Sequence, residues 1–224
     1  MKKYRALYAI CSLVLSFCML PIGADAASTR VLSEEDVCTL ANSINIEQEY
    51  ERAQAGISDI PVTKEMLSLN EAVLTDENGN EESLPVIGTV RKLGQVQRSN
   101  KLCNVYTITA FASSVKTDTD SETLHNTTAF GSITWIDNTG INNELVSVSG
   151  GWTTGGTDQL SGRSVEYGAD NNDDKSAFYE LGDGVNSFSY SGTDKMVGWV
   201  MYLDTYVNVN SKKLSFRVTG RMGF

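Results

Sequence analysis

An acidic stretch in the second half of the chain carries side-chain oxygens at alternate positions. Asp170, Asn172 and Asp174 stand at the first, third and fifth positions of a calcium-loop pattern, in which such oxygens surround a hard cation. The pattern then departs from an EF-hand, because Lys175 stands where glycine is required and Glu180 comes one residue before the bidentate acid. No cofactor is firmly implied. Ca²⁺ bound irregularly by Asp170, Asn172, Asp174 and Glu180 is the one candidate, and a solvated acidic connection is the alternative.

The residue types used in acid–base catalysis give few leads. The chain has a single histidine, His125, and no G-x-S-x-G, H-E-x-x-H or phosphate-loop motif. Glu144, Glu166 and Glu180 could supply the two carboxylates of a glycan hydrolase, which stand about 5–10 Å apart across a cleft. Because acids are abundant in this chain, that pattern is weak evidence for an enzyme, and we predict no catalytic residue.

Aromatic and charged residues near the C-terminus suggest a ligand surface instead. Tyr202, Asp204 and Tyr206 share one parity of a predicted strand, and Arg217 and Arg221 share the polar parity of the next strand. Such a face could bind a sugar or an acidic ligand. Cross-strand charge pairing on a solvated sheet is the simpler alternative.

Trp152, in the stretch GGWTTGGTDQLSG, is a further candidate for ligand binding. It shares parity with Val146 and Val148, so an unbroken strand would place its ring in the core. A β-bulge at Gly150 or Gly151 would reverse that parity and turn the indole outward. We expect the core position, with a bulge at these glycines as the observation that would overturn it.

The first 26 residues have the parts of a secretory signal peptide. Three basic residues precede an uncharged apolar run over residues 6–22, and the sequence Ala-Asp-Ala ends at Ala26. Cleavage after Ala26 removes three basic residues and one acid, which leaves 15 basic against 27 acidic residues and a net charge of −12. That charge disfavours nucleic acid and anionic lipid as partners. We therefore expect a secreted, extracellular protein of bacterial type.

Cleavage also removes two of the four cysteines and leaves Cys38 and Cys103. An even number of cysteines in an oxidising compartment predicts a disulfide between them. This bond would close a loop of about 65 residues, which the chain-entropy model values at roughly 4 kcal/mol. Two free thiols are the alternative.

Hydrophobic periodicity divides the rest of the chain. From Val37 to Ile44, apolar residues recur at helical spacing behind Ser33, which can cap a helix, so residues 34–55 are predicted to form one amphipathic helix. From about residue 70 the period changes to two. The last 30 residues are predicted to form a hairpin around the sequence NSKK, with Trp199 on the buried parity of its first strand.

These patterns predict a mainly β fold. Turn signals separate about eight to ten strands, without alternating helices, which favours an antiparallel β-sandwich of jelly-roll-like or Greek-key type with one N-terminal helix. A closed antiparallel β-barrel is the alternative. We expect a signal peptide over 1–26, a helical segment over 27–62 and the sandwich over 63–224.

Three classes of function remain open. The first is a secreted, non-catalytic binding protein for a cell-envelope glycan or an extracellular protein. The second is a secreted toxin or bacteriocin-like antagonist, for which alone a membrane would be the partner; a strand with one apolar parity fits membrane insertion and any sandwich equally. The third is the glycan hydrolase with paired carboxylates.

Overall fold

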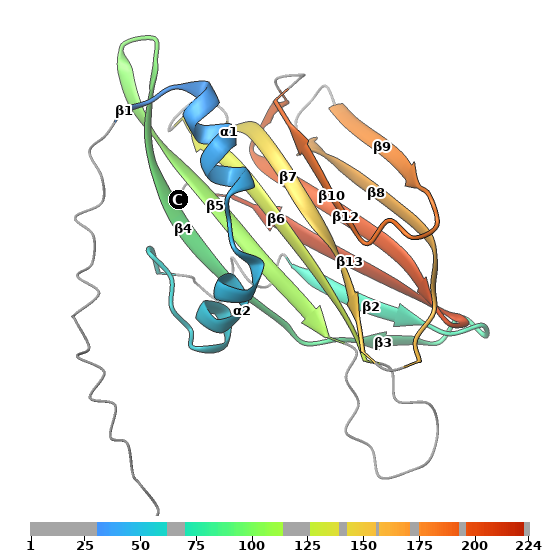
Figure 1. Cartoon of the computed structure of the whole chain (residues 1–224). Helices are drawn as coiled ribbons and strands as arrows, with labels where there is room; N and C mark the ends of the chain where they lie inside the picture. The colour runs from blue at the N-terminus through green and yellow to red at the C-terminus, as the bar shows by residue number, and fades with distance from the viewer. Residues whose placement is uncertain are drawn as a thin grey trace, which may run out of the picture.

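The structure is a computed structural model that describes residues 31–61, 70–113, 126–138, 143–155, 157–170, 175–192 and 196–221. The predicted signal peptide lies outside the described residues, as do His125, Asn172 and Asp174. The described strands form two sheets that pack face to face (Figure 1).

The seven-stranded sheet has the order β1-β4-β5-β6-β7-β10, and β11 also pairs with β7. Its strands are β1 (Val31–Leu32), β4 (Val86–Arg98), β5 (Lys101–Ser113), β6 (Thr127–Asp137), β7 (Asn143–Thr154), β10 (Ser187–Ser191) and β11 (Val197–Gly198). The six-stranded sheet has the order β3-β2-β13-β12-β8-β9. Its strands are β2 (Glu71–Thr75), β3 (Glu81–Ser83), β8 (Leu160–Asp170), β9 (Lys175–Leu181), β12 (Val200–Val209) and β13 (Lys212–Gly220).

This arrangement confirms the predicted sandwich and not the closed barrel. One sheet curls like half a barrel, but the two sheets remain separate. All strand pairs are antiparallel except β1 with β4, which is parallel. Strands outnumber the eight to ten expected, because β1, β3 and β11 have only two or three residues each and leave no periodic signal in the sequence.

The main core lies between the two sheets. Alternate residues of each strand point into it, and the fully buried members include Trp135, Ile133 and Phe216. Burial of large aromatic and branched side chains stabilises a fold by roughly 1.5–3 kcal/mol each. Apolar residues recur at every second position in the sequence because each strand turns alternate side chains into this one core layer.

Two helices, rather than the single helix predicted, cover the outer face of the seven-stranded sheet (Figure 1). They are α1 (Glu34–Asn42) and α2 (Ile46–Gln54). The predicted cap is confirmed, because Ser33 Oγ accepts from the backbone N–H of Asp36. The break arises at Asn45, whose side-chain oxygen accepts from the first backbone N–H groups of α2 and starts a new helix.

Each helix is anchored to the sheet beneath it. On α1, Val37 packs in a second apolar cluster with Val96 and Val105. On α2, the ring of Tyr50 meets that of Phe111 edge-on, with 5.1 Å between their centroids. The seven-stranded sheet is thereby covered on both faces.

The predicted C-terminal hairpin is confirmed in β12 and β13, which pair from Met201 with Gly220 to Val209 with Lys212. One expectation about it is wrong, because Trp199 is not buried but 65% exposed. Gly198 pairs with β7 in one sheet, while Val200 pairs with β8 in the other. The chain thus passes between the sheets at Trp199, which breaks the parity of the strand.

The predicted disulfide between Cys38 and Cys103 is absent, and both thiols are free. The two residues belong to the same apolar cluster, but their sulfurs have different neighbours. Cys103 Sγ donates to Asn138 Oδ1 at 3.6 Å, whereas Cys38 lines a pocket beside Val146 and Gly192. Burial raises the pKa of Cys103 and so favours its protonated form.

Candidate functional site

The outer face of the six-stranded sheet is the large sheet surface that carries no helix in the described part of the chain. Strand register places polar and aromatic side chains side by side across it, because residues directly opposite on paired strands share a face. One row crosses five strands and consists of Glu71, Arg217, Asp204, Glu166 and Phe178. We name Tyr202, Asp204, Tyr206, Arg217 and Glu166 the tyrosine–arginine face.

A bidentate ion pair lies at the centre of this face. Arg217 Nε and Nη2 each donate to a carboxylate oxygen of Asp204 at 2.6 Å. The Asp204 side chain is 7% exposed and that of Arg217 is 46% exposed, so the carboxylate is covered while the guanidinium reaches solvent. The hydrogen bonds to Asp204 raise the pKa of Arg217. The guanidinium is therefore charged and held in one orientation.

The two tyrosines flank this ion pair along β12. Arg217 lies over the ring of Tyr202 at 5.7 Å, and Lys213 Nζ lies over the ring of Tyr206 at 4.7 Å. Tyr202 Oη also donates to Glu166 Oε1 at 3.5 Å. Burial raises the pKa of both phenols, so both hydroxyls stay protonated at neutral pH. Four of the six ligand-binding candidates from the sequence thus form one cluster.

The remaining two candidates lie in different surroundings. Arg221 follows the end of β13 and is exposed. Trp152 is 2% exposed and packs in the core between the sheets, against Phe188 at a centroid distance of 5.9 Å. The core position expected for Trp152 is confirmed, so its ring is not on the tyrosine–arginine face.

The bulge in β7 lies earlier than the glycine pair. Pairing with β6 is regular from Thr154 back to Ser147 and then skips Val146, which packs in the second apolar cluster, on the outer side. Leu145 returns to the main core. Because the skipped residue precedes Val148, the parity from Val148 to Trp152 is unbroken and the indole faces inward.

The glycines before Trp152 have a packing role. A Cβ on Gly150 would lie 2.7 Å from the backbone oxygen of Phe130 and 2.8 Å from Cζ of Phe188. A Cβ on Gly151 would collide with the backbone oxygen of Asn186. The pair therefore lets the neighbouring strands and the ring of Phe188 approach β7 closely.

The residues proposed for calcium binding are not all brought together. Asp170 ends β8 next to Ala169, which pairs with Lys175, whereas Glu180 pairs with Ser164 near the other end of β9. Glu180 lies five residue steps along β9 from Lys175, a distance of about 17 Å. Glu180 is thus remote from Asp170. Among the described residues, no group of three or more His, Cys, Asp or Glu side chains is placed to hold a metal ion.

The three glutamates considered for glycan hydrolysis do not form one cluster either. Glu166 and Glu180 are diagonal neighbours on β8 and β9, on the outer face of the six-stranded sheet. Glu144 lies on the other sheet, where both its carboxylate oxygens accept from Arg98 at 3.0 and 3.2 Å. Arg98 also contacts Glu34 of α1 at 3.0 Å, so these residues tie the helix to the sheet.

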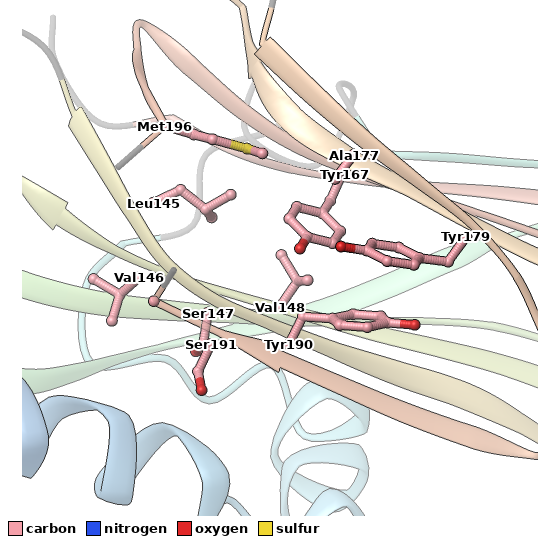
Figure 2. Close-up of a pocket in the computed structure, with 11 residues that line it drawn as sticks. Leu145, Val146, Ser147, Val148, Tyr167, Ala177, Tyr179, Tyr190, Ser191 and Met196 are labelled. Atoms are coloured by element: carbon pink, nitrogen blue, oxygen red, sulfur yellow. The ribbon is translucent and has the colours of Figure 1, made fainter. Parts of the chain in front are cut away.

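A pocket that sequence reasoning missed opens at one edge of the sandwich (Figure 2). Tyr179 of β9 stacks on Tyr190 of β10 at 4.5 Å, and both rings lie near Tyr167 of β8. The pocket is small, with a volume of about 50 Å³, and it is partly open to solvent. Alternation along each strand could predict that these rings point inward. Only the packing of the two sheets against each other brings the three strands together at this edge.

Comparison with protein-family models, curated proteins and solved structures finds no match to this chain. Of the helices in the described residues, none is both long and apolar enough to span a membrane. The functional argument therefore rests on the geometry of the face.

Proposed function

We propose that this protein is a secreted, non-catalytic binding protein that holds a cell-envelope glycan on its tyrosine–arginine face. The observation that carries the proposal is the contrast between the sheets. Helices cover the outer face of one sheet, whereas the other sheet presents an ordered row of aromatic and polar side chains.

The chemistry of the face suits a hydroxyl-rich ligand. Tyr202 and Tyr206 supply ring surfaces and hydroxyls, and Arg217 and Glu166 supply a charged donor and a charged acceptor. Their mutual contacts hold these groups in place before a ligand arrives, which reduces the entropy lost on binding. The acidic composition makes nucleic acid an unfavourable alternative.

The test is binding to a glycan array and to insoluble cell-wall polysaccharide. Tyr202→Ala with Tyr206→Ala should weaken binding by about fivefold to a hundredfold, because two aromatic contacts at about 0.5–1.5 kcal/mol each are lost. Trp199→Ala is the matched control, since Trp199 is an exposed aromatic residue outside the face. Equal binding by the double variant and the wild type would refute the use of this face.

Two other results would favour the competing functions. Loss of polysaccharide mass during incubation would indicate a hydrolase, and leakage of dye from liposomes would indicate a membrane-active toxin. Secretion rests on the leader-like sequence before Ala27. Mass spectrometry of protein from the culture medium should give a chain that starts at Ala27.

A further inference from the structure

We propose that Arg163 is the binding site of a small carboxylate anion, on the inner side of the six-stranded sheet and separate from the tyrosine–arginine face. Arg163 stands near the start of β8, where it pairs with Leu181 at the end of β9. It shares parity with Val165, which is buried in the main core, so its side chain points inward and not toward the tyrosines. This inference does not depend on the glycan proposal.

Arg163 carries a buried positive charge whose donors are mostly unused. Its side chain is only 5% exposed. Nη2 donates to Asn186 Oδ1 at 3.1 Å, but Nε and Nη1 are covered and have no hydrogen-bond partner among the described residues. A guanidinium in a protein stays ionised, and buried charges are normally paired because desolvating an isolated ion is costly. A negatively charged acceptor is therefore what this position lacks.

Asp183 does not supply that charge. Its Oδ1 lies 3.9 Å from Arg163 Nη1, which is beyond hydrogen-bond distance. The Asp183 side chain is also 93% exposed, so water screens its carboxylate and the pair contributes little. The positive charge of Arg163 thus remains largely uncompensated by the described residues.

Two other arginines show how this chain pairs a partly buried guanidinium. Arg98 Nε donates to Glu144 at 3.0 Å, and Arg217 Nε donates to Asp204 at 2.6 Å. Their side chains are 20% and 46% exposed, against 5% for Arg163. The most deeply buried of these three guanidinium groups is thus the one whose Nε lacks a carboxylate. A carboxylate from solution has the planar pair of oxygens that suits its free N–H groups.

The turn between β9 and β10 covers the site and provides the route to it. Asp183 and Asn186 place this turn against the guanidinium. A Cβ on Gly182 or Gly184 would meet nothing within 4 Å, so the turn stands clear of the protein body at both glycines and can move without losing apolar contacts. Asn186 is exposed, and its amide nitrogen would add a donor beside the anion. Because the free nitrogens of Arg163 lie beneath the turn, the site suits a ligand of a few atoms.

The test uses formate and formamide, which have similar shapes and differ in charge, with ¹⁵N-labelled full-length protein at constant ionic strength. Formate should shift the Arg163 Nε–H signal saturably, with a dissociation constant on the order of 1–10 mM, and formamide should bind at least about tenfold more weakly. The Nε–H signals of Arg98 and Arg217 should stay in place, because carboxylates already accept from them. No saturable shift with formate, or an equal affinity for formamide, would overturn the proposal.

Three variants distinguish an external anion from an internal partner. Arg163→Lys, with folding checked by circular dichroism, assigns the signal. Asp183→Asn removes a charge of the same sign as the ligand and should strengthen formate binding about two- to fivefold. Glu180→Gln removes the same charge from the outer face of the sheet and should leave the affinity within about twofold of the wild type. Formate binding seen only in Asp183→Asn would identify Asp183 as the partner of Arg163 and overturn the proposal, whatever the outcome of the glycan test.

Discussion

The close approach at Gly150 makes a sharp prediction about stability. In Gly150→Ala, the new methyl group would meet the backbone oxygen of Phe130 at 2.7 Å and Cζ of Phe188 at 2.8 Å. The backbone oxygen is fixed by the pairing of β6 with β7, and the ring is held against Trp152. Neither the backbone oxygen nor the ring can move away without losing its own contacts. Overpacking of this kind destabilises the folded state by about 1–3 kcal/mol. Alanine also restricts the unfolded chain more than glycine does, which offsets up to about 1 kcal/mol of that cost.

We therefore expect Gly150→Ala to lose about 1–2 kcal/mol and to lower the melting temperature by roughly 2–8 °C. Thermal unfolding followed by near-ultraviolet circular dichroism measures this change. Gly182→Ala is the matched control, because a Cβ there meets nothing within 4 Å. Its stability should stay within about 0.5 kcal/mol of the wild type or rise slightly.

A second variant tests whether the ring of Phe188 causes the loss of stability in Gly150→Ala. Phe188→Val removes the ring atoms that crowd Gly150, so Gly150→Ala should cost less in that background than in the wild type. Equal melting temperatures for Gly150→Ala and Gly182→Ala would show that β7 accepts the methyl group. That result would contradict the conclusion that Gly150 is needed for the ring of Phe188 to pack against β7.

Three further predictions concern single side chains. Burial raises the pKa of Glu49 above its usual 4.5 despite the nearby Arg91, so wild-type stability should fall relative to Glu49→Gln as pH rises from 4 to 7, measured by urea unfolding. Hydrogen bonds from Asn80 and its neighbours lower the pKa of Asp76 below 3.8, so the wild type should lose stability relative to Asp76→Ala as pH falls below about 4, in the same assay. Trp199→Ser should change stability by less than about 0.5 kcal/mol and remove the fluorescence component most accessible to iodide.

The sequence predicted the sandwich because its core is a single layer that each strand reaches with every second residue. The same rule correctly placed Trp152 inside and the two tyrosines of β12 outside. It failed at Trp199 because parity assumes that a strand stays in one sheet, and here the chain changes sheets.

The helix prediction failed for a local reason. Helical periodicity continues through residues 43–45, but the side chain of Asn45 bonds the backbone more favourably as a cap than as an interior residue. The disulfide prediction relied on the even number of cysteines left after cleavage and on the oxidising compartment expected for a secreted protein. Only the packing of α1 shows which neighbours each sulfur meets.

By itself, the sequence determined which residues have apolar or polar alternation, and therefore the fold class and the members of the tyrosine–arginine face on β12 and β13. The tertiary structure alone decided that Asp204 pairs with Arg217, that the two described helices pack on the same sheet, and that three tyrosines from separate strands line a pocket. The physical reason is that alternation is a property of one strand, whereas register, sheet order and the meeting of two sheets at an edge depend on contacts between residues far apart in the chain.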